Sequence, residues 1–79
     1  MLTQAMAKAF APEIAVNCVA PGWIDQDGEE TQAATRFAAK TPMKRNGSAE
    51  DIAQAVLFFA TGPGFVTGQI LAVDGGLGL

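Results

Sequence analysis

The segment that most constrains the fold of this chain is the short run IAVNCVA at residues 14–20. The run is too short and too rich in β-branched residues to favour a helix, and its alternate positions are apolar on both faces. Such a strand is typical of a parallel sheet that is covered on both sides. Asn17 is the polar exception, and we expect neighbouring backbone groups to satisfy its amide.

The residues before this strand show the spacing of an amphipathic helix. Apolar residues recur there every four positions and form one stripe, and Pro12 then ends the helix. The members of the stripe are Leu2, Met6 and Phe10. After the strand, residues 23–47 are loop-like, and alanines and long side chains favour a short helix at Thr31 to Lys40.

A better marked helix begins after Ser48. Ser48 and Asp51 have the spacing of a capping box, and acids in the first turn suit the helix dipole. Gly62-Pro63 ends this helix. Its predicted apolar stripe consists of Ile52, Val56 and Phe59.

A second short apolar strand, Gln69 to Val73, follows and is closed by the turn Asp74-Gly75-Gly76. The order helix, strand, long loop, helix, strand predicts one right-handed β-α-β unit preceded by a helix. The fold class is therefore α/β. With 79 residues, the chain is at most one domain.

The composition is apolar for so small a chain. Hydrophobic residues make up 49% and charged residues 16%, against about 25% charged in an average domain. A domain of this size buries only part of its apolar surface. We expect some of that surface to meet another copy or another chain; the alternative is an ordinary small core.

The charge of the chain excludes some partners. A net charge of −3 and a pI near 4.5 argue against nucleic acid, which requires a basic face. The one basic cluster, Lys40, Lys44 and Arg45, is interpreted as solvated and is given no ligand.

The lone cysteine and the lack of histidine exclude other classes of site. Cys18 cannot form an internal disulfide, and neither a cysteine cage nor a histidine-based metal site is available. In mid-strand, Cys18 is expected to act as a small hydrophobe, which suits the reducing cytoplasm. No apolar run reaches the ~18 residues of a membrane span, and the start of the chain lacks the features of a signal peptide.

The strand at 14–20 stops at Pro21-Gly22, which we call the Pro-Gly corner. Ligands of open α/β sheets bind just beyond the carboxyl ends of the strands, where this corner would lie. A proline with fixed φ and a glycine without a side chain turn the backbone sharply and would let a flat group approach. A plain strand-ending turn is the alternative.

Three segments in order, AVNCVAPGWI, TPMKRNGSAEDIAQAVLFFA and FVTGQILAVDGG, resemble the C-terminal part of the short-chain dehydrogenase/reductase family. The resemblance covers nearly all of residues 1–79. It implies a partial Rossmann-like fold in which the two predicted strands are the last two of the sheet. Three layers are then expected only after self-association.

The resemblance also implies a site. In that family the corner borders the nicotinamide of NAD or NADP, so Pro21, Gly22 and Ile24 would be the cofactor-binding positions, Ile24 through its backbone. The segment after the corner would form a substrate lid. Trp23 would pack near that lid or be a corner aromatic without substrate contact. Gln26 stands where the family has a threonine.

Two family motifs are absent from these residues. No T-G-x-x-x-G-x-G turn occurs, and the chain has no tyrosine, so the catalytic Y-x-x-x-K pair is missing. Lys8, at an exposed helix position, would stay protonated and is no substitute base. We therefore expect no catalytic residue, no metal and no cofactor for this chain alone, and Pro21, Gly22 and Ile24 would be vestigial.

These observations predict a truncated, non-catalytic segment of an NAD(P)-dependent oxidoreductase that forms a homodimer or higher homo-oligomer. One alternative is half of a split oxidoreductase that a complementary polypeptide completes. A second is a small protein-interaction module. The substrate and the choice between NAD and NADP are not determined by these residues.

Overall fold

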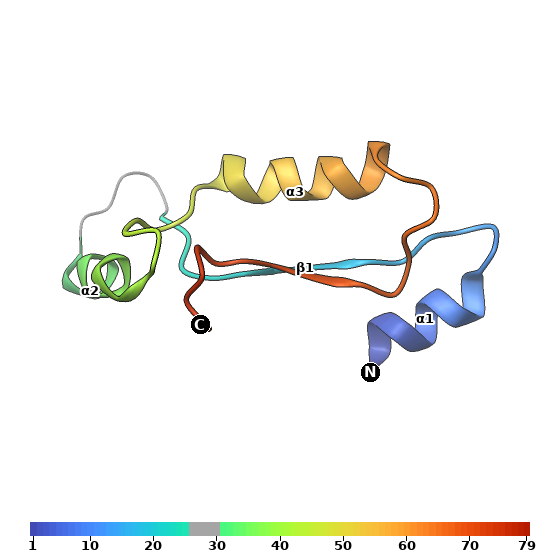
Figure 1. Cartoon of the computed structure of the whole chain (residues 1–79), viewed down its shortest axis with the longest axis horizontal. Coiled ribbons are helices and arrows are strands. Elements are labelled where there is room, and N and C mark those ends of the chain that lie inside the picture. The colour runs from blue at the N-terminus through green and yellow to red at the C-terminus, as the bar shows by residue number, and fades with distance from the viewer. Residues whose placement is uncertain (26–30) are drawn as a thin grey trace.

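The computed structural model describes residues 1–25 and 31–79. Its elements, in chain order, are α1 (Leu2–Phe10), β1 (Cys18–Pro21), α2 (Gln32–Lys40), α3 (Ala49–Thr61) and β2 (Ile70–Val73). The expected long loop therefore contains a helix, α2, where the alanine-rich segment predicted a short one. Figure 1 shows α2 at the end of the molecule where both strands stop.

The two strands form a parallel sheet in which Cys18 pairs with Ile70 and Pro21 with Val73. α3 runs along one side of the strands, and α1 lies on the other side near their opposite end (Figure 1). The α/β class and the strand-helix-strand unit are confirmed. Among the described residues only α3 makes extensive contact with the strands, so the expectation that three layers form only after self-association stays a prediction.

The first strand is shorter than residues 14–20. The ladder begins at Cys18, whose amide donates to the carbonyl of Gln69 (2.9 Å), and before it one main-chain bond runs from the Gly68 amide to the Val16 carbonyl (2.7 Å). Before it, the Val16 amide donates to the hydroxyl of Thr67 (3.0 Å), so a side chain replaces the backbone partner. Gly68 has a positive φ of 73°, which interrupts the extended backbone of the facing segment.

The prediction for Asn17 is confirmed. Its Nδ2 donates to the carbonyl of Val66 (3.1 Å), and its Oδ1 accepts from the amide of Gln69 (3.0 Å). The side chain thus bonds the two segments together just before the ladder begins. Asn17 belongs to the sheet and not to a site.

The predicted capping box is confirmed at the start of α3. The Ser48 hydroxyl accepts from the Asp51 amide (3.3 Å), and the Asp51 carboxylate accepts from the Ser48 amide (2.8 Å). Thr31 caps α2 with its hydroxyl alone, which accepts from the Ala34 amide (3.0 Å). Local side-chain chemistry therefore sets where both helices begin.

Few side chains are buried. Among the described residues only Ala7, Ala34 and Thr41 are buried, and none of them is completely shielded from solvent. The predicted stripe of α1 is exposed, because the helix turns the small Ala7 inward, next to Gly68. On α3, Ile52, Ala55 and Phe59 are half-buried, whereas Val56, expected in the stripe, is 52% exposed.

Within the part of the chain described here, no helix combines the length and apolar character needed to cross a bilayer. The same residues contain no group of three or more acidic, histidine or cysteine side chains placed to hold a metal ion.

Candidate functional site

The Pro-Gly corner lies at the carboxyl edge of the sheet. Pro21 is the last residue of β1 and Val73 the last of β2, and the Gly22 amide donates to the Val73 carbonyl (3.1 Å). Because the two strands are parallel, both of them end at this edge of the sheet, where open α/β sheets bind ligands. All three positions assigned to cofactor binding, Pro21, Gly22 and Ile24, are thus together here.

Gly22 is required by a close contact within the chain. A Cβ placed there would lie 2.8 Å from the Cβ and 2.9 Å from the Cα of Asp74. The sequence predicted that the lack of a side chain at Gly22 would leave space for a flat ligand. The structure instead fills that space with the first residue after β2, so this glycine by itself does not indicate a ligand.

Ile24 forms a parallel bridge with Gly47. The Gly47 amide donates to the carbonyl of Trp23 (2.9 Å), and the amide of Asp25 donates to the carbonyl of Gly47 (3.0 Å). In such a bridge the central residue directs its own amide and carbonyl to the other side. No hydrogen bond among the described residues uses either group of Ile24.

Trp23 stacks on Phe37 of α2, with ring centroids 4.7 Å apart and an angle of 19° between the planes. Trp23 therefore packs on the helix that follows the corner, where a lid was expected. Offset stacking of this kind adds about 0.5–1.5 kcal/mol beyond area burial. Gln26, the departure from the family pattern, lies outside the described residues.

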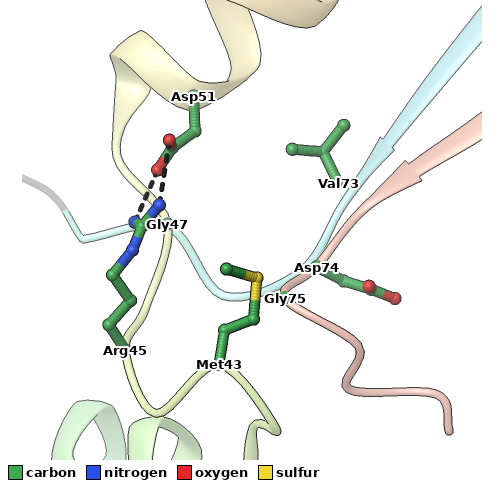
Figure 2. A pocket seen from close by; sticks show the side chains of 7 residues that line it. All are labelled: Met43, Arg45, Gly47, Asp51, Val73, Asp74 and Gly75. Atoms are coloured by element: carbon green, nitrogen blue, oxygen red, sulfur yellow. Dashed lines mark hydrogen bonds and ion pairs between the residues drawn. The ribbon is translucent and has the colours of Figure 1, made fainter.

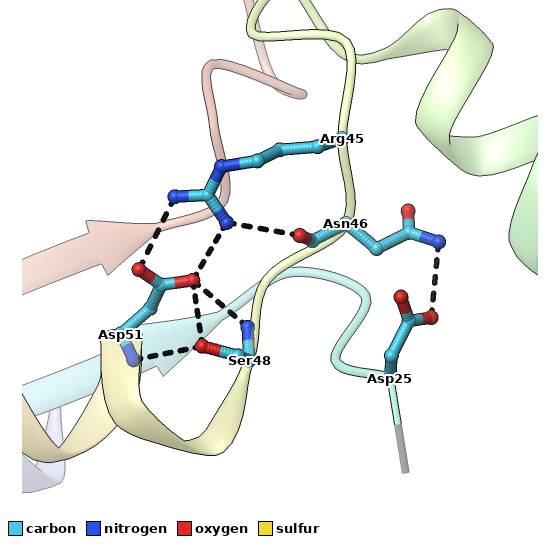
Figure 3. A network of polar contacts seen from close by, with 5 residues as sticks. All are labelled: Asp25, Arg45, Asn46, Ser48 and Asp51. Atoms are coloured by element: carbon cyan, nitrogen blue, oxygen red, sulfur yellow. Dashed lines mark hydrogen bonds and ion pairs between the residues drawn. The ribbon is translucent and has the colours of Figure 1, made fainter. Parts of the chain in front are cut away.

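An ion pair joins the loop before α3 to its first turn (Figure 3). The guanidinium of Arg45 bonds both oxygens of the Asp51 carboxylate, at 2.8 and 3.2 Å. The hydrogen bond from Arg45, followed by that from the Ser48 amide, holds the pKa of Asp51 far below its ordinary range. The same bond raises the pKa of Arg45. Arg45 is therefore engaged by Asp51, whereas the basic cluster was expected to be merely solvated.

Beside this ion pair, a hollow of about 110 Å³ lies between the start of α3 and the strand ends (Figure 2). Its lining residues are Met43, Arg45, Gly47, Asp51, Val73, Asp74 and Gly75. Sites for drug-sized ligands usually measure about 300–1,000 Å³. This hollow is therefore smaller than such sites usually are.

Sequence analysis did not assign Gly47 or Asp74 to this region. Asp74 begins the closing turn: its Oδ1 accepts from the Gly76 amide (2.9 Å), and Gly75 has a positive φ of 62°. The Asp-Gly-Gly signal marked the turn but not its contact with the corner. Gly47 carried no signal, because its role arises from a pairing with Ile24 across more than twenty residues.

Known proteins resemble this chain over nearly its whole length. A family model described as "Enoyl-(Acyl carrier protein) reductase" matches residues 1–78. The 3-oxoacyl-[acyl-carrier-protein] reductase FabG of Chlamydia trachomatis is 43% identical over 80 residues, covering 90% of this chain and 32% of the relative. The bovine 3-oxoacyl-[acyl-carrier-protein] reductase is 42% identical, covering 98% and 32%.

Solved structures superimpose closely on nearly all of this chain. A short-chain dehydrogenase/reductase from Serratia marcescens superimposes with a TM-score of 0.88 at 35% identity, over 99% of this chain and 34% of that one. A blue fluorescent protein from a metagenomic library, in complex with NADPH, gives 0.86 at 35% identity, over 99% and 33%. The chain thus spans about a third of the length of the relatives it matches.

Proposed function

This chain belongs to the short-chain dehydrogenase/reductase family, and we propose that it supplies the nicotinamide-side wall of an NAD(P)-dependent oxidoreductase site. In this proposal residues 1–79 are the C-terminal part of the family's domain. Pro21, Gly22 and Ile24 border the cofactor, and α2 lies on the substrate side. On their own these residues are non-catalytic.

The observation that carries the proposal is the backbone of Ile24. Its amide and carbonyl are free of hydrogen bonds among the described residues and point away from Gly47, beside the corner. The carboxamide of nicotinamide carries one acceptor oxygen and an NH₂ donor, which match one amide and one carbonyl. When bound, the dinucleotide would supply hydride chemistry, and this chain would fix the orientation of its ring.

The lack of a side chain suited to donate a proton supports the proposal that the chain alone is non-catalytic. Reduction of a carbonyl needs a positioned acid, and the 79 residues contain neither tyrosine nor histidine. The names of the relatives suggest carbonyl reduction, with NADPH as one cofactor to test. The single cysteine favours a reducing, cytoplasmic compartment.

Self-association is supported by exposed area. The chain has an accessible surface of 5942 Å², whereas a folded monomer of 8.2 kDa should expose about 4,500 Å². The excess is about 1,400 Å², larger than the ~800 Å² that each partner buries in a standard interface. We propose a homodimer or higher homo-oligomer that covers the exposed stripe of α1 and the unpaired edge of β1.

The split-oxidoreductase alternative has its own support. Although it spans a third of the relatives, the chain keeps their backbone geometry with a TM-score of 0.88. It could therefore be completed by a polypeptide carrying the glycine-rich turn and the Tyr-Lys pair. Such a partner would compete with self-association for the same unpaired edge.

Calorimetric titration with NAD, NADH, NADP and NADPH tests the proposal, first with the chain alone and then with a complementary polypeptide. The chain alone should show no saturable binding at micromolar concentration. A polypeptide matching the first two-thirds of the Chlamydia relative should restore binding when mixed with it. In that mixture Ile24→Pro, which removes the amide, should lose binding, and Ile24→Val should keep it. Tight binding by the chain alone, or equal binding by both variants, would refute the proposal.

A further inference from the structure

We propose that Asn46 holds α2 against the segment that follows the Pro-Gly corner. The inference rests on the proposed function only in treating α2 as the substrate side of the site. Asn46 lies in the loop between α2 and α3, beside Gly47 and the bridge to Ile24. No motif in the sequence singled it out.

One amide group of Asn46 joins three segments. Its Nδ2 donates to the carbonyl of Ala34 within α2 (2.7 Å) and to Oδ1 of Asp25, just after the corner (3.2 Å). Figure 3 shows the Asn46 side chain extending from the loop toward Asp25. The residue thereby ties α2, the corner and the start of α3 to one point.

The orientation of this amide is determined by its partners. Both contacted atoms are oxygens without a hydrogen to donate, so the nitrogen of the amide must face them. The cost is a buried Oδ1 that has no hydrogen-bond partner among the described residues. An apolar side chain would avoid that cost, so the two donated bonds are what an asparagine contributes here.

α2 depends on such bonds because it has little other support. Among the described residues it makes no extensive contact with another helix or strand. Its Ala34 is one of the few buried side chains, and its Phe37 rests on Trp23. Lys44 adds one exposed bond from the same loop, from its Nζ to the carbonyl of Ala39 (3.0 Å). Loss of the Asn46 bonds should therefore free α2 without unfolding the rest.

Two readouts follow α2 in the full 79-residue chain. Hydrogen exchange compares the amides of α2 with those of α3. Acrylamide quenching follows Trp23, the only tryptophan, which is shielded by Phe37. The variants are Asn46→Leu, which removes both bonds, Asn46→Asp, which places a carboxylate against two oxygens, and Asp25→Ala, which removes one acceptor. Lys44→Met is the matched control, since it removes an exposed bond from the same loop to the same helix.

Asn46→Leu should lower protection in α2 about tenfold, with α3 unchanged and Trp23 quenched more readily. Asn46→Asp should lower it further, Asp25→Ala by about threefold, and Lys44→Met by less than about twofold. The proposal is overturned if α2 keeps its protection in Asn46→Leu, or if α2 and α3 lose protection equally in both Asn46→Leu and Asp25→Ala. No dinucleotide is present, so this outcome is independent of the proposed cofactor role.

Discussion

Replacing Gly22 by alanine tests the contact that brings the two strand ends together. The added Cβ would lie 2.8 and 2.9 Å from two atoms of Asp74, one of them backbone, and these distances are shorter than real Cβ contacts. A flexible side chain cannot relieve this overlap, so the backbone after β2 must move. Overpacking of this kind costs about 1–3 kcal/mol. The movement also lengthens the bond from the Gly22 amide to Val73, worth about 1 kcal/mol.

We therefore expect Gly22→Ala to lower the free energy of unfolding by about 2–4 kcal/mol. Urea denaturation followed by circular dichroism measures this, at one fixed protein concentration because association shifts apparent stability. Gly64→Ala is the matched control, since nothing lies within 4 Å of its added Cβ and its φ is not positive. That variant should change stability by less than about 0.5 kcal/mol.

Equal stability of the two variants would refute the argument. It would mean that the segment after β2 moves away from the corner without cost, and that the pairing of Gly22 with Val73 does not hold the strand ends. A loss in Gly22→Ala that is confined to the denaturant slope would instead indicate a changed denatured state.

Four further predictions concern the helices. Ser48→Ala should cost about 1 kcal/mol in urea denaturation, because the capping box loses its hydroxyl. Asp51→Asn should destabilise α3 near neutral pH. Because the pKa of Asp51 is lowered in the folded state, its stabilising effect is fully present above the ordinary carboxyl pKa of about 4 and is lost as the pH falls. The free energies of unfolding of the two proteins should therefore converge as the pH is lowered. Phe37→Leu should raise acrylamide quenching of the tryptophan while leaving α3 intact. Met6→Lys should weaken self-association in sedimentation, and Gln4→Lys on the same helix should not.

The elements that sequence analysis located correctly are those with local determinants. The Ser48–Asp51 capping box and the proline after α1 act within a few residues, so their signals are complete in the sequence. The start of β1 was wrong because it depends on Thr67, about fifty residues away. The same limit hid Asn46, whose partners Asp25 and Ala34 lie in other segments.

The apolar stripes show a different limit. Periodicity correctly gave α1 an apolar face, but it does not say what covers that face. In this structure Leu2, Met6 and Phe10 are exposed while the small Ala7 is inside. α1 packs through Ala7 next to Gly68, in the segment before β2, and leaves its larger side chains exposed. The exposed stripe and the buried alanine thus lie on different faces of one helix.

One edge of β1 pairs with no other strand among the described residues, and this edge cannot by itself hold a partner. Cys18 and Gly22 direct their amides to the β2 segment, so the alternate residues Val19 and Pro21 face the other edge. Pro21 has no amide hydrogen, which leaves Val19 as the one donor that β1 offers there. A single donor cannot fix the register of an added strand. Any partner, a second copy included, must therefore gain most of its stability and its alignment from the apolar faces.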